Sequence, residues 1–213
     1  QHERRTAELI ARSLPHVAVT LSSDVSPEMR EYERFSTACA NAYLQPLMGR
    51  YLGRLENELA RAGFRCPMLL MTSGGGITST ETAARFPVRL VESGPAGGAI
   101  FASCVARQSG LDHVVSFDMG GTTAKLCLID KARPQTARAF EVARIYRFLK
   151  GSGLPLRIPV IEMVEIGAGG GSIARVDALG RIGVGPDSAG STPGPVCYGR
   201  GGIEPTVTDA DIV

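Results

Sequence analysis

The residues best suited to chemistry lie in one short segment, positions 114–130, which reads VVSFDMGGTTAKLCLID. Asp118 precedes two glycines and two threonines at 120–123. The glycines can take positive φ and let a ligand approach the backbone, and consecutive amides in such a turn bind anions. Hydroxyl donors and a carboxylate at a strand end suit a phosphate with hydrated Mg²⁺. The segment predicts a phosphate clasp with Asp118 as metal ligand and catalytic carboxylate; a tight hairpin with a solvated aspartate is the alternative. The candidate nucleotide-binding residues of the turn are Gly120, Gly121, Thr122 and Thr123.

Glycine makes up 26 of the 213 residues, and the excess lies in a few dense loops where a site lined by backbone would be built. One such loop, GAGGGS at 167–172, follows an extended segment with an acidic end. A second stretch, SGPAGG at 93–98, precedes a helical pattern, and either presents helix amides to an anion or lets the helix pack closely. The further nucleotide-binding candidates are Gly167, Gly169, Gly170, Gly171 and Ser172.

The elements around these loops predict an α/β domain with the hairpin antiparallel in a mixed sheet and helices on its faces. The rival is an all-parallel dinucleotide-binding sheet in which the glycine turn opens a helix. Periodicity and end signals predict helices over 3–14, 26–62 and 99–108, with Pro46 kinking or dividing the second and Gly63 ending it. Strands are predicted over 16–22, 68–72, 89–92 and 159–166, and a hairpin over 173–184.

Composition excludes several classes of protein. A hydrophobic content of 44% with 21% charged residues indicates a globular chain. A net charge of +2 without basic runs argues against nucleic-acid binding. No apolar run approaches the roughly 20 residues that a membrane span needs. Five cysteines without metal-binding spacing indicate reduced thiols in a cytoplasmic protein, with a reactive role at Cys104 or Cys197 as a minor alternative.

Six motifs together carry a resemblance, which covers nearly all of the chain. They are SGPAGG at 93–98, DMGGT at 118–122, IGAGGGSI at 166–173, GPDSAG at 185–190, PGPVCYG at 193–199 and PTVTDA at 205–210. In this order they resemble the A subunit of the hydantoinase/5-oxoprolinase family, which also includes acetone carboxylase subunits.

This resemblance implies an actin/hexokinase/Hsp70-like ATPase fold in which the hairpin at 118–123 is the second of two phosphate clasps. It implies that ATP and Mg²⁺ activate the carbonyl of a cyclic amide, such as hydantoin, N-methylhydantoin or 5-oxoproline, for hydrolytic ring opening. It also implies a B-type partner subunit. The alternatives are an acetone carboxylase-type subunit and a non-catalytic scaffold that binds nucleotide.

Two departures from the family pattern matter. The earlier D-x-G-G-T hairpin is lacking and the chain ends just after the T-D-A motif. We therefore expect the central part of a subunit, with an α/β region over 1–110 and a β-rich region over 111–213, inactive alone and open to homo-oligomer formation. Ala124 and Lys125 also replace a usual Thr-Asp pair, which puts a metal or base role at position 125 in doubt and places an ammonium there instead.

Overall fold

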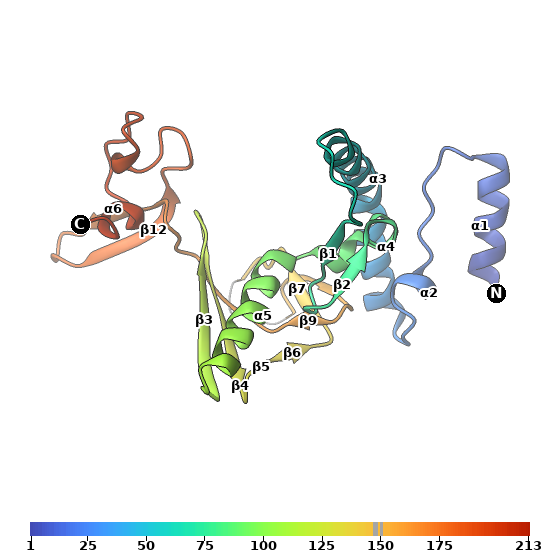
Figure 1. Ribbon diagram of the computed structural model, residues 1–213, viewed down its shortest axis with the longest axis horizontal. Coiled ribbons are helices and arrows are strands. Elements are labelled where there is room, and N and C mark those ends of the chain that lie inside the picture. Colours follow the sequence, from blue (N-terminus) through green and yellow to red (C-terminus); the bar gives the residue numbers. More distant parts are fainter. Residues whose placement is uncertain (147–148, 150) are drawn as a thin grey trace. The chain divides into compact units, whose positions relative to one another are not determined.

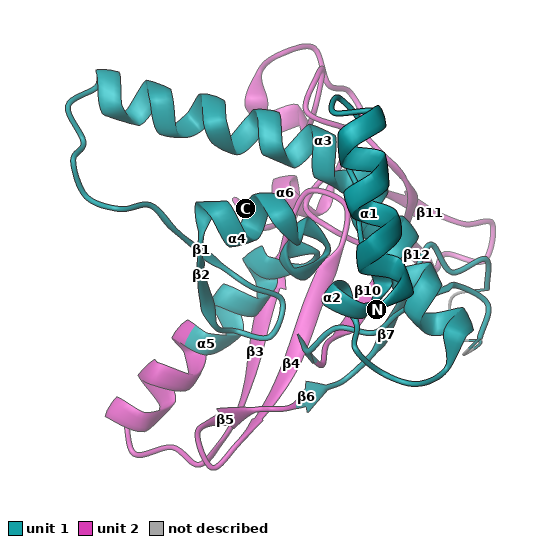
Figure 2. Cartoon of the chain, turned by 90° about the vertical axis from the view of Figure 1, so that its right-hand side faces the viewer, with its two compact units in different colours: residues 1–100, 136–161 teal, residues 101–135, 162–213 magenta. Residues whose placement is uncertain are grey.

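The computed structural model describes residues 1–146, 149 and 151–213. The chain forms two compact units, coloured separately in Figure 2. Unit 1 comprises Gln1–Ile100 and Thr136–Ile161, and unit 2 comprises Phe101–Gln135 and Glu162–Val213. Every residue of the predicted clasp and of the glycine loop at 167–172 belongs to unit 2, so the candidate site lies within one unit.

Unit 1 is mainly helical, with short two-stranded pairs (Figure 1). Its helices are α1 (His2–Ser13), α2 (Ser22–Val25), α3 (Glu31–Arg61), α4 (Thr80–Arg85), the 3-10 helix η1 (Pro87–Leu90) and the first half of α5 (Ser93–Gln108). Its strands are β1 (Leu69–Met71), β2 (Ile77–Ser79), β6 (Thr136–Ala137), β7 (Phe140–Val142), β8 (Leu154–Leu156) and β9 (Val160–Ile161).

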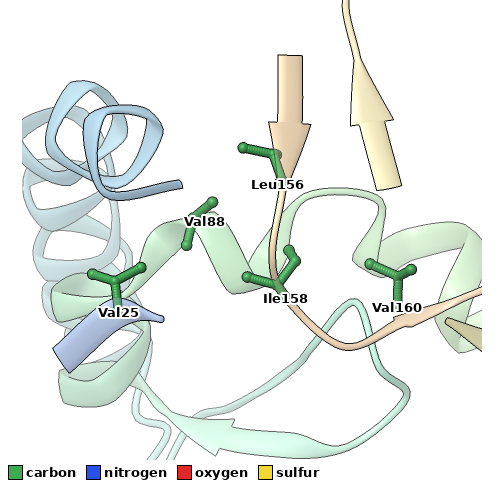
Figure 3. Packing of buried hydrophobic residues seen from close by; sticks show 5 residues of the cluster. All are labelled: Val25, Val88, Leu156, Ile158 and Val160. Carbon is green, nitrogen blue, oxygen red and sulfur yellow. The ribbon is translucent and has the colours of Figure 1, made fainter. Parts of the chain in front are cut away.

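The core of unit 1 gathers side chains from α2, η1, β8, β9 and the segment between these two strands (Figure 3). Val88 is fully buried, and Leu156 and Ile158 are each 1% exposed. Burying an aliphatic side chain of this size contributes about 1.5–3 kcal/mol. Segments distant in the sequence therefore share one apolar cluster, whose members are Val25, Val88, Leu156, Ile158 and Val160.

The long helix α3 differs from its prediction at its first residue. It begins at Glu31 rather than near residue 26, because Arg30 has φ +78°, outside the helical region. Pro46 does not divide it, and the helix continues to Arg61. Gly63, at φ +91°, follows its last turn as predicted.

Several predictions of strands in the first half are wrong. Residues 16–22 form no strand, and 89–92 overlap the 3-10 helix η1. Alternating apolar residues form a strand only where a partner strand satisfies the backbone, and the structure pairs neither segment. Helix α5 begins at Ser93, so the glycine-rich stretch 93–98 is its first turns rather than a loop before it.

Unit 2 is built on the predicted hairpin, whose strands β3 (His113–Met119) and β4 (Ala124–Asp130) pair along their whole length. The register sets Phe117 opposite Leu126 and Asp118 opposite Lys125. The hairpin prediction is confirmed, as is the hairpin of β11 and β12. The remaining elements are β5 (Arg133–Pro134), β10 (Val164–Ile166), β11 (Ser172–Val176), β12 (Ile182–Ser188), the 3-10 helix η2 (Val196–Tyr198) and α6 (Val207–Ala210).

The main sheet has the order β10-β4-β3, with β5 also on β4. Every strand pairing among the described residues is antiparallel, so the prediction of a mixed sheet is wrong for this chain. A parallel pair needs a crossover that returns to the same sheet. Helix α5 instead connects the β1–β2 pair to a different sheet. The predicted strand 159–166 is likewise divided into β9 and β10, which pair with different partners.

Two side chains on one face of β4 are buried, and one of them is a cysteine. Cys127 and Ile129, two residues apart on β4, are each 2% exposed, as expected for side chains on the same face. Burial raises the pKa of the Cys127 thiol. Ser103 of α5 donates from its hydroxyl to the carbonyl of Ala132, which follows β4, and thereby ties the second half of the helix to this region.

Candidate phosphate clasp

The turn of the β3–β4 hairpin has backbone amides that are available to bind an anion. The Gly120 amide donates to the Thr123 carbonyl at 2.9 Å, which closes the turn. The amides of Gly121, Thr122 and Thr123 donate to no acceptor among the residues that the structure describes. Gly120, Gly121 and Thr122 are exposed. An exposed turn with three successive uncommitted amides is the kind of concavity that binds an anion.

The glycines of this turn do not have the conformation that the sequence suggested. Neither Gly120 nor Gly121 has positive φ. A Cβ added to Gly121 would meet nothing within 4 Å, and one added to Gly120 would meet only the Thr123 carbonyl, at 3.7 Å. Neither backbone strain nor packing within this chain therefore requires glycine at position 121.

The glycine loop at 167–172 packs against this turn through its backbone. The Gly170 amide donates to the Gly120 carbonyl at 2.9 Å, and the Gly171 amide donates to the Gly121 carbonyl at 2.8 Å. The structure thus brings together the two stretches that the sequence marked separately. The two hydrogen bonds hold the turn by its carbonyl groups and leave its amides out of the contact.

The same loop uses its remaining amides internally. The Gly169 amide donates to Ser172 Oγ, and the Ser172 amide donates to the Gly169 carbonyl, both at 2.9 Å. Ser172 is 2% exposed. The amides of residues 169–172 are therefore all engaged, whereas the exposed Gly167 donates from its amide to no acceptor among the described residues.

The loop glycines, unlike Gly121, are required by close approach. A Cβ on Gly169 would lie 2.6 Å from the Gly120 carbonyl oxygen and from the amide nitrogens of Thr122 and Thr123. A Cβ on Gly170 would lie 2.6 Å from Thr208 Oγ1. At Gly169 the close atoms are all backbone, so the backbone must shift and only glycine allows the loop to lie against the turn. At Gly170 the close atom is the end of a side chain, which would have to move away from the added Cβ.

Asp118 is the next-to-last residue of β3, directly before the turn, and is exposed. The register places Lys125 of β4 opposite both Asp118 of β3 and Glu165 of β10. Directly opposed residues have Cβ atoms about 4.5–5.5 Å apart, so Lys125 is the cross-strand neighbour of both acidic residues. Among the described residues no group of three His, Cys, Asp or Glu side chains could hold a metal ion. A single carboxylate is nevertheless sufficient for Mg²⁺, which keeps several waters and binds substrate phosphates.

A layer of polar contacts from the end of the chain supports the glycine loop. The amide and the hydroxyl of Thr208 both donate to the Gly170 carbonyl, each at 2.9 Å. The Ala189 amide donates to the Gly171 carbonyl at 2.8 Å. The motifs at 185–190 and 205–210 therefore meet the glycine loop directly.

Asp209 is the centre of this layer. Its carboxylate accepts from the amides of Val196, Cys197 and Thr206 at 3.2, 2.7 and 2.8 Å, and from the Thr206 hydroxyl at 2.9 Å. Removal from water raises this pKa, but the hydrogen bonds from Cys197 and Thr206 outweigh it and hold the pKa of Asp209 well below its usual range. A hydrogen bond between the Cys197 thiol and the Asp209 carboxylate raises the pKa of that thiol, which argues against Cys197 as a thiolate nucleophile.

The lowered pKa of Asp209 predicts a loss of stability in acid. Because the pKa is lower in the folded state, its contribution is complete above the unfolded-state pKa, about 4, and is lost as the pH falls below that value. We expect the melting temperature of the wild type to exceed that of Asp209→Asn at neutral pH, and the difference to shrink continuously below pH ~4. Melting curves between pH 3 and 7 measure it, with Asp211→Asn, an exposed carboxylate nearby, as control. A constant difference over this range would contradict the assignment.

Sequence reasoning did not identify Thr208, Asp209 or Ala189 as part of the site. One signal was present: a threonine followed three residues later by an acid is a capping-box pattern, and Thr206 and Asp209 form that box at the start of α6. The pattern predicts a helix start. It does not show that this helix lies against the glycine loop.

Among the described helices, none is both long and apolar enough to cross a membrane. The five cysteines are all unpaired. Both observations agree with the sequence, which has no apolar run of membrane-spanning length and no metal-binding spacing of cysteines.

Proteins that match nearly all of this chain include two enzyme subunits and a 5-oxoprolinase. The alpha subunit of caprolactamase from Pseudomonas jessenii is 40% identical over 211 residues, 99% of this chain and 29% of that subunit. The acetophenone carboxylase gamma subunit of Aromatoleum aromaticum is 37% identical over 221 residues, 100% of this chain and 28% of that subunit. The 5-oxoprolinase 1 of Arabidopsis thaliana is 32% identical over 211 residues, 97% of this chain and 15% of that protein. The chain thus spans less than a third of the length of each.

The structural comparison agrees with these matches. The crystal structure of ATP-dependent caprolactamase from Pseudomonas jessenii superimposes with a TM-score of 0.73 at 39% identity, covering 99% of this chain and 29% of that chain. The sequence profile described as hydantoinase/oxoprolinase matches residues 34–213, which include the whole clasp and its supporting layer. The chain therefore belongs to the hydantoinase/oxoprolinase family.

Proposed function

We propose that this chain supplies a phosphate clasp to an ATP-dependent enzyme that opens the ring of a cyclic amide, within an actin/hexokinase/Hsp70-like ATPase domain. The observation that carries the proposal is the exposed turn at 120–123, where three amides lack acceptors among the described residues beside the strand-end carboxylate of Asp118. The similarity to an ATP-dependent caprolactamase and to a 5-oxoprolinase supports the reaction class.

In this proposal the amides of Gly121, Thr122 and Thr123 bind phosphate oxygens of ATP, with the threonine hydroxyls as further donors. Asp118 holds hydrated Mg²⁺, which when bound neutralises charge on the phosphates. The open space at Gly121 fits this role, because the turn leaves room for a ligand on its backbone.

The glycine loop divides into two parts in this proposal. The amides of Gly169, Gly170, Gly171 and Ser172 already donate within the protein, so these residues act by holding the turn. Gly167, which is exposed and whose amide has no acceptor in the described part of the chain, is the loop residue that we assign to contact the nucleotide.

The chemistry that we propose needs no nucleophile from this chain. Transfer of the γ-phosphoryl group of ATP to the amide oxygen breaks the bond to ADP and converts that oxygen into a leaving group. Water then adds to the activated carbon, and the bond to the ring nitrogen breaks, which frees the nitrogen as a protonated amine and leaves an acyl phosphate. A second water hydrolyses the acyl phosphate, so that the lactam, ATP and two waters give ADP, phosphate and the ring-opened acid. The raised pKa of Cys197 agrees with water as the nucleophile.

A carboxylase reaction is the second candidate, because the acetophenone carboxylase gamma subunit is also similar over the whole chain. A non-catalytic scaffold that binds nucleotide is the third. We further propose a B-type partner subunit, since the caprolactamase and acetophenone carboxylase relatives are themselves named as subunits. The five unpaired cysteines favour the reducing environment of the cytoplasm.

A substrate panel separates these candidates. We expect the full-length protein, with its partner subunit, to release ADP when caprolactam, hydantoin, N-methylhydantoin or 5-oxoproline is added, and not without them. ADP release is followed by a coupled assay, and the opened amino acid is identified by mass spectrometry. Release that requires a ketone and bicarbonate instead would establish the carboxylase. Nucleotide binding without turnover on any substrate would favour the scaffold.

A further inference from the structure

We infer that Thr208 is a positioning residue for the phosphate clasp, acting through Gly170 on the turn at 120–123. The inference rests on the proposed function for its consequence in catalysis, and on the hydrogen bonds of unit 2 for its geometry. Thr208 lies 85 residues or more from the turn in sequence and shares no hydrogen bond with it among the described residues.

The peptide groups of Gly170 are held on both sides. Its carbonyl accepts from the Thr208 amide and from Thr208 Oγ1, both at 2.9 Å. Its amide donates to the Gly120 carbonyl at 2.9 Å. Gly170 has no side chain to resist rotation of its backbone, so these bonds decide its orientation.

Thr208 is itself held in place, although α6 has only four residues and a helix of that length is not stable alone. The Thr206–Asp209 capping box closes its first turn. The Thr206 backbone bridges to Ile173 of β11, and the Ala174 amide donates to the Pro205 carbonyl at 2.8 Å. The hydroxyl of Thr208 is therefore presented to Gly170 from a backbone that is attached to β11.

The turn depends on this support. Gly120 and Gly121 accept from Gly170 and Gly171, and a Cβ at Gly169 would touch the amides of Thr122 and Thr123. A change in the Gly170 peptide therefore moves the acceptor at Gly120 and, with it, the amides proposed to bind phosphate. Thr208 thus sets the affinity of the clasp without touching the nucleotide.

The test compares three variants of the full-length protein with the wild type. Thr208→Val keeps the shape of the side chain and removes the hydroxyl donor, whereas Thr208→Ser keeps the donor. Thr136→Val makes the same exchange at an exposed position in unit 1. Hydrogen exchange of the segment 118–124, followed by mass spectrometry without nucleotide, reports the turn directly. Steady-state ADP release reports KM for ATP and kcat separately.

We expect Thr208→Val to raise the exchange rate of segment 118–124 and to raise KM for ATP about tenfold with a smaller change in kcat. Thr208→Ser and Thr136→Val should stay within about twofold of the wild type in both measurements. A merely structural role would lower the amount of active protein, and so kcat, without changing KM. Unchanged exchange in Thr208→Val, or failure of Thr208→Ser to restore it, would overturn the inference. Absence of ADP release by the wild type on every substrate would count against the proposed function alone, because the exchange measurement still decides the positioning role.

Discussion

Alanine at position 169 is expected to disable the protein, although the exchange adds a single methyl group. The added Cβ would lie 2.6 Å from three backbone atoms of the turn, which no side-chain rotation can relieve. Overpacking a buried site costs about 1–3 kcal/mol, and we expect the upper end here because backbone rather than side chain must move. For a chain of this length that predicts a fall in melting temperature of about 6–12 °C.

Gly121→Ala is the matched control for this exchange. A Cβ at Gly121 meets nothing within 4 Å and its φ is not positive, so the melting temperature should stay within about 1 °C of the wild type. Gly121→Val should be equally stable but lose ATP binding, since its branched side chain occupies the space proposed for the nucleotide. Calorimetry and ATP titration measure the two effects separately. Equal stability of Gly169→Ala and Gly121→Ala would contradict the packing of the loop on the turn.

Asp118→Asn is expected to lower kcat for substrate-dependent ADP release by about 10²–10³, the loss seen when one electrostatic contact to a transition state is removed. Asparagine has the shape of aspartate without its charge, so the variant loses its attraction for Mg²⁺ and keeps its volume. Asp118 is exposed, and we expect the melting temperature to change little. The assay is ADP release over a range of Mg²⁺ concentrations, where the variant should need more Mg²⁺ to reach its reduced maximum.

Asp112→Asn serves as the control for charge. Asp112 is an exposed carboxylate immediately before β3, at the opposite end of the strand from the turn. The Asp112→Asn exchange removes one negative charge from unit 2, as Asp118→Asn does, and the activity of this variant should match that of the wild type. Wild-type kcat and Mg²⁺ dependence in Asp118→Asn would remove the metal role from the proposal and leave phosphate binding to the other groups of the clasp.

The hairpin at the centre of the site could be predicted from local sequence, because its strands and turn are neighbours along the chain. Apolar residues on both sides of the Gly-Gly turn determine which residues pair, and the observed register joins Phe117 to Leu126 as such a hairpin requires. The capping box at Thr206 and the end of α3 before Gly63 are local in the same sense. The predictions of strands at 16–22 and 89–92 were wrong. A strand also needs a partner strand, and the periodicity of one segment does not indicate whether a partner is present.

The sequence by itself determined the chemistry that is available: a strand-end carboxylate, a turn of glycines and threonines, and a second glycine-rich loop. Only the tertiary structure decided how these parts are used. It places Gly169 and Gly170 against the Gly120–Thr123 turn and Thr208 behind them, contacts between residues about 40–90 positions apart. Such contacts depend on the path of the whole chain rather than on neighbouring residues, because backbone amides carry no sequence signal of the acceptor that they will find. For that reason the same glycine-rich composition describes both an exposed turn with three amides that lack acceptors among the described residues and a loop in which the amides of residues 169–172 are already bonded.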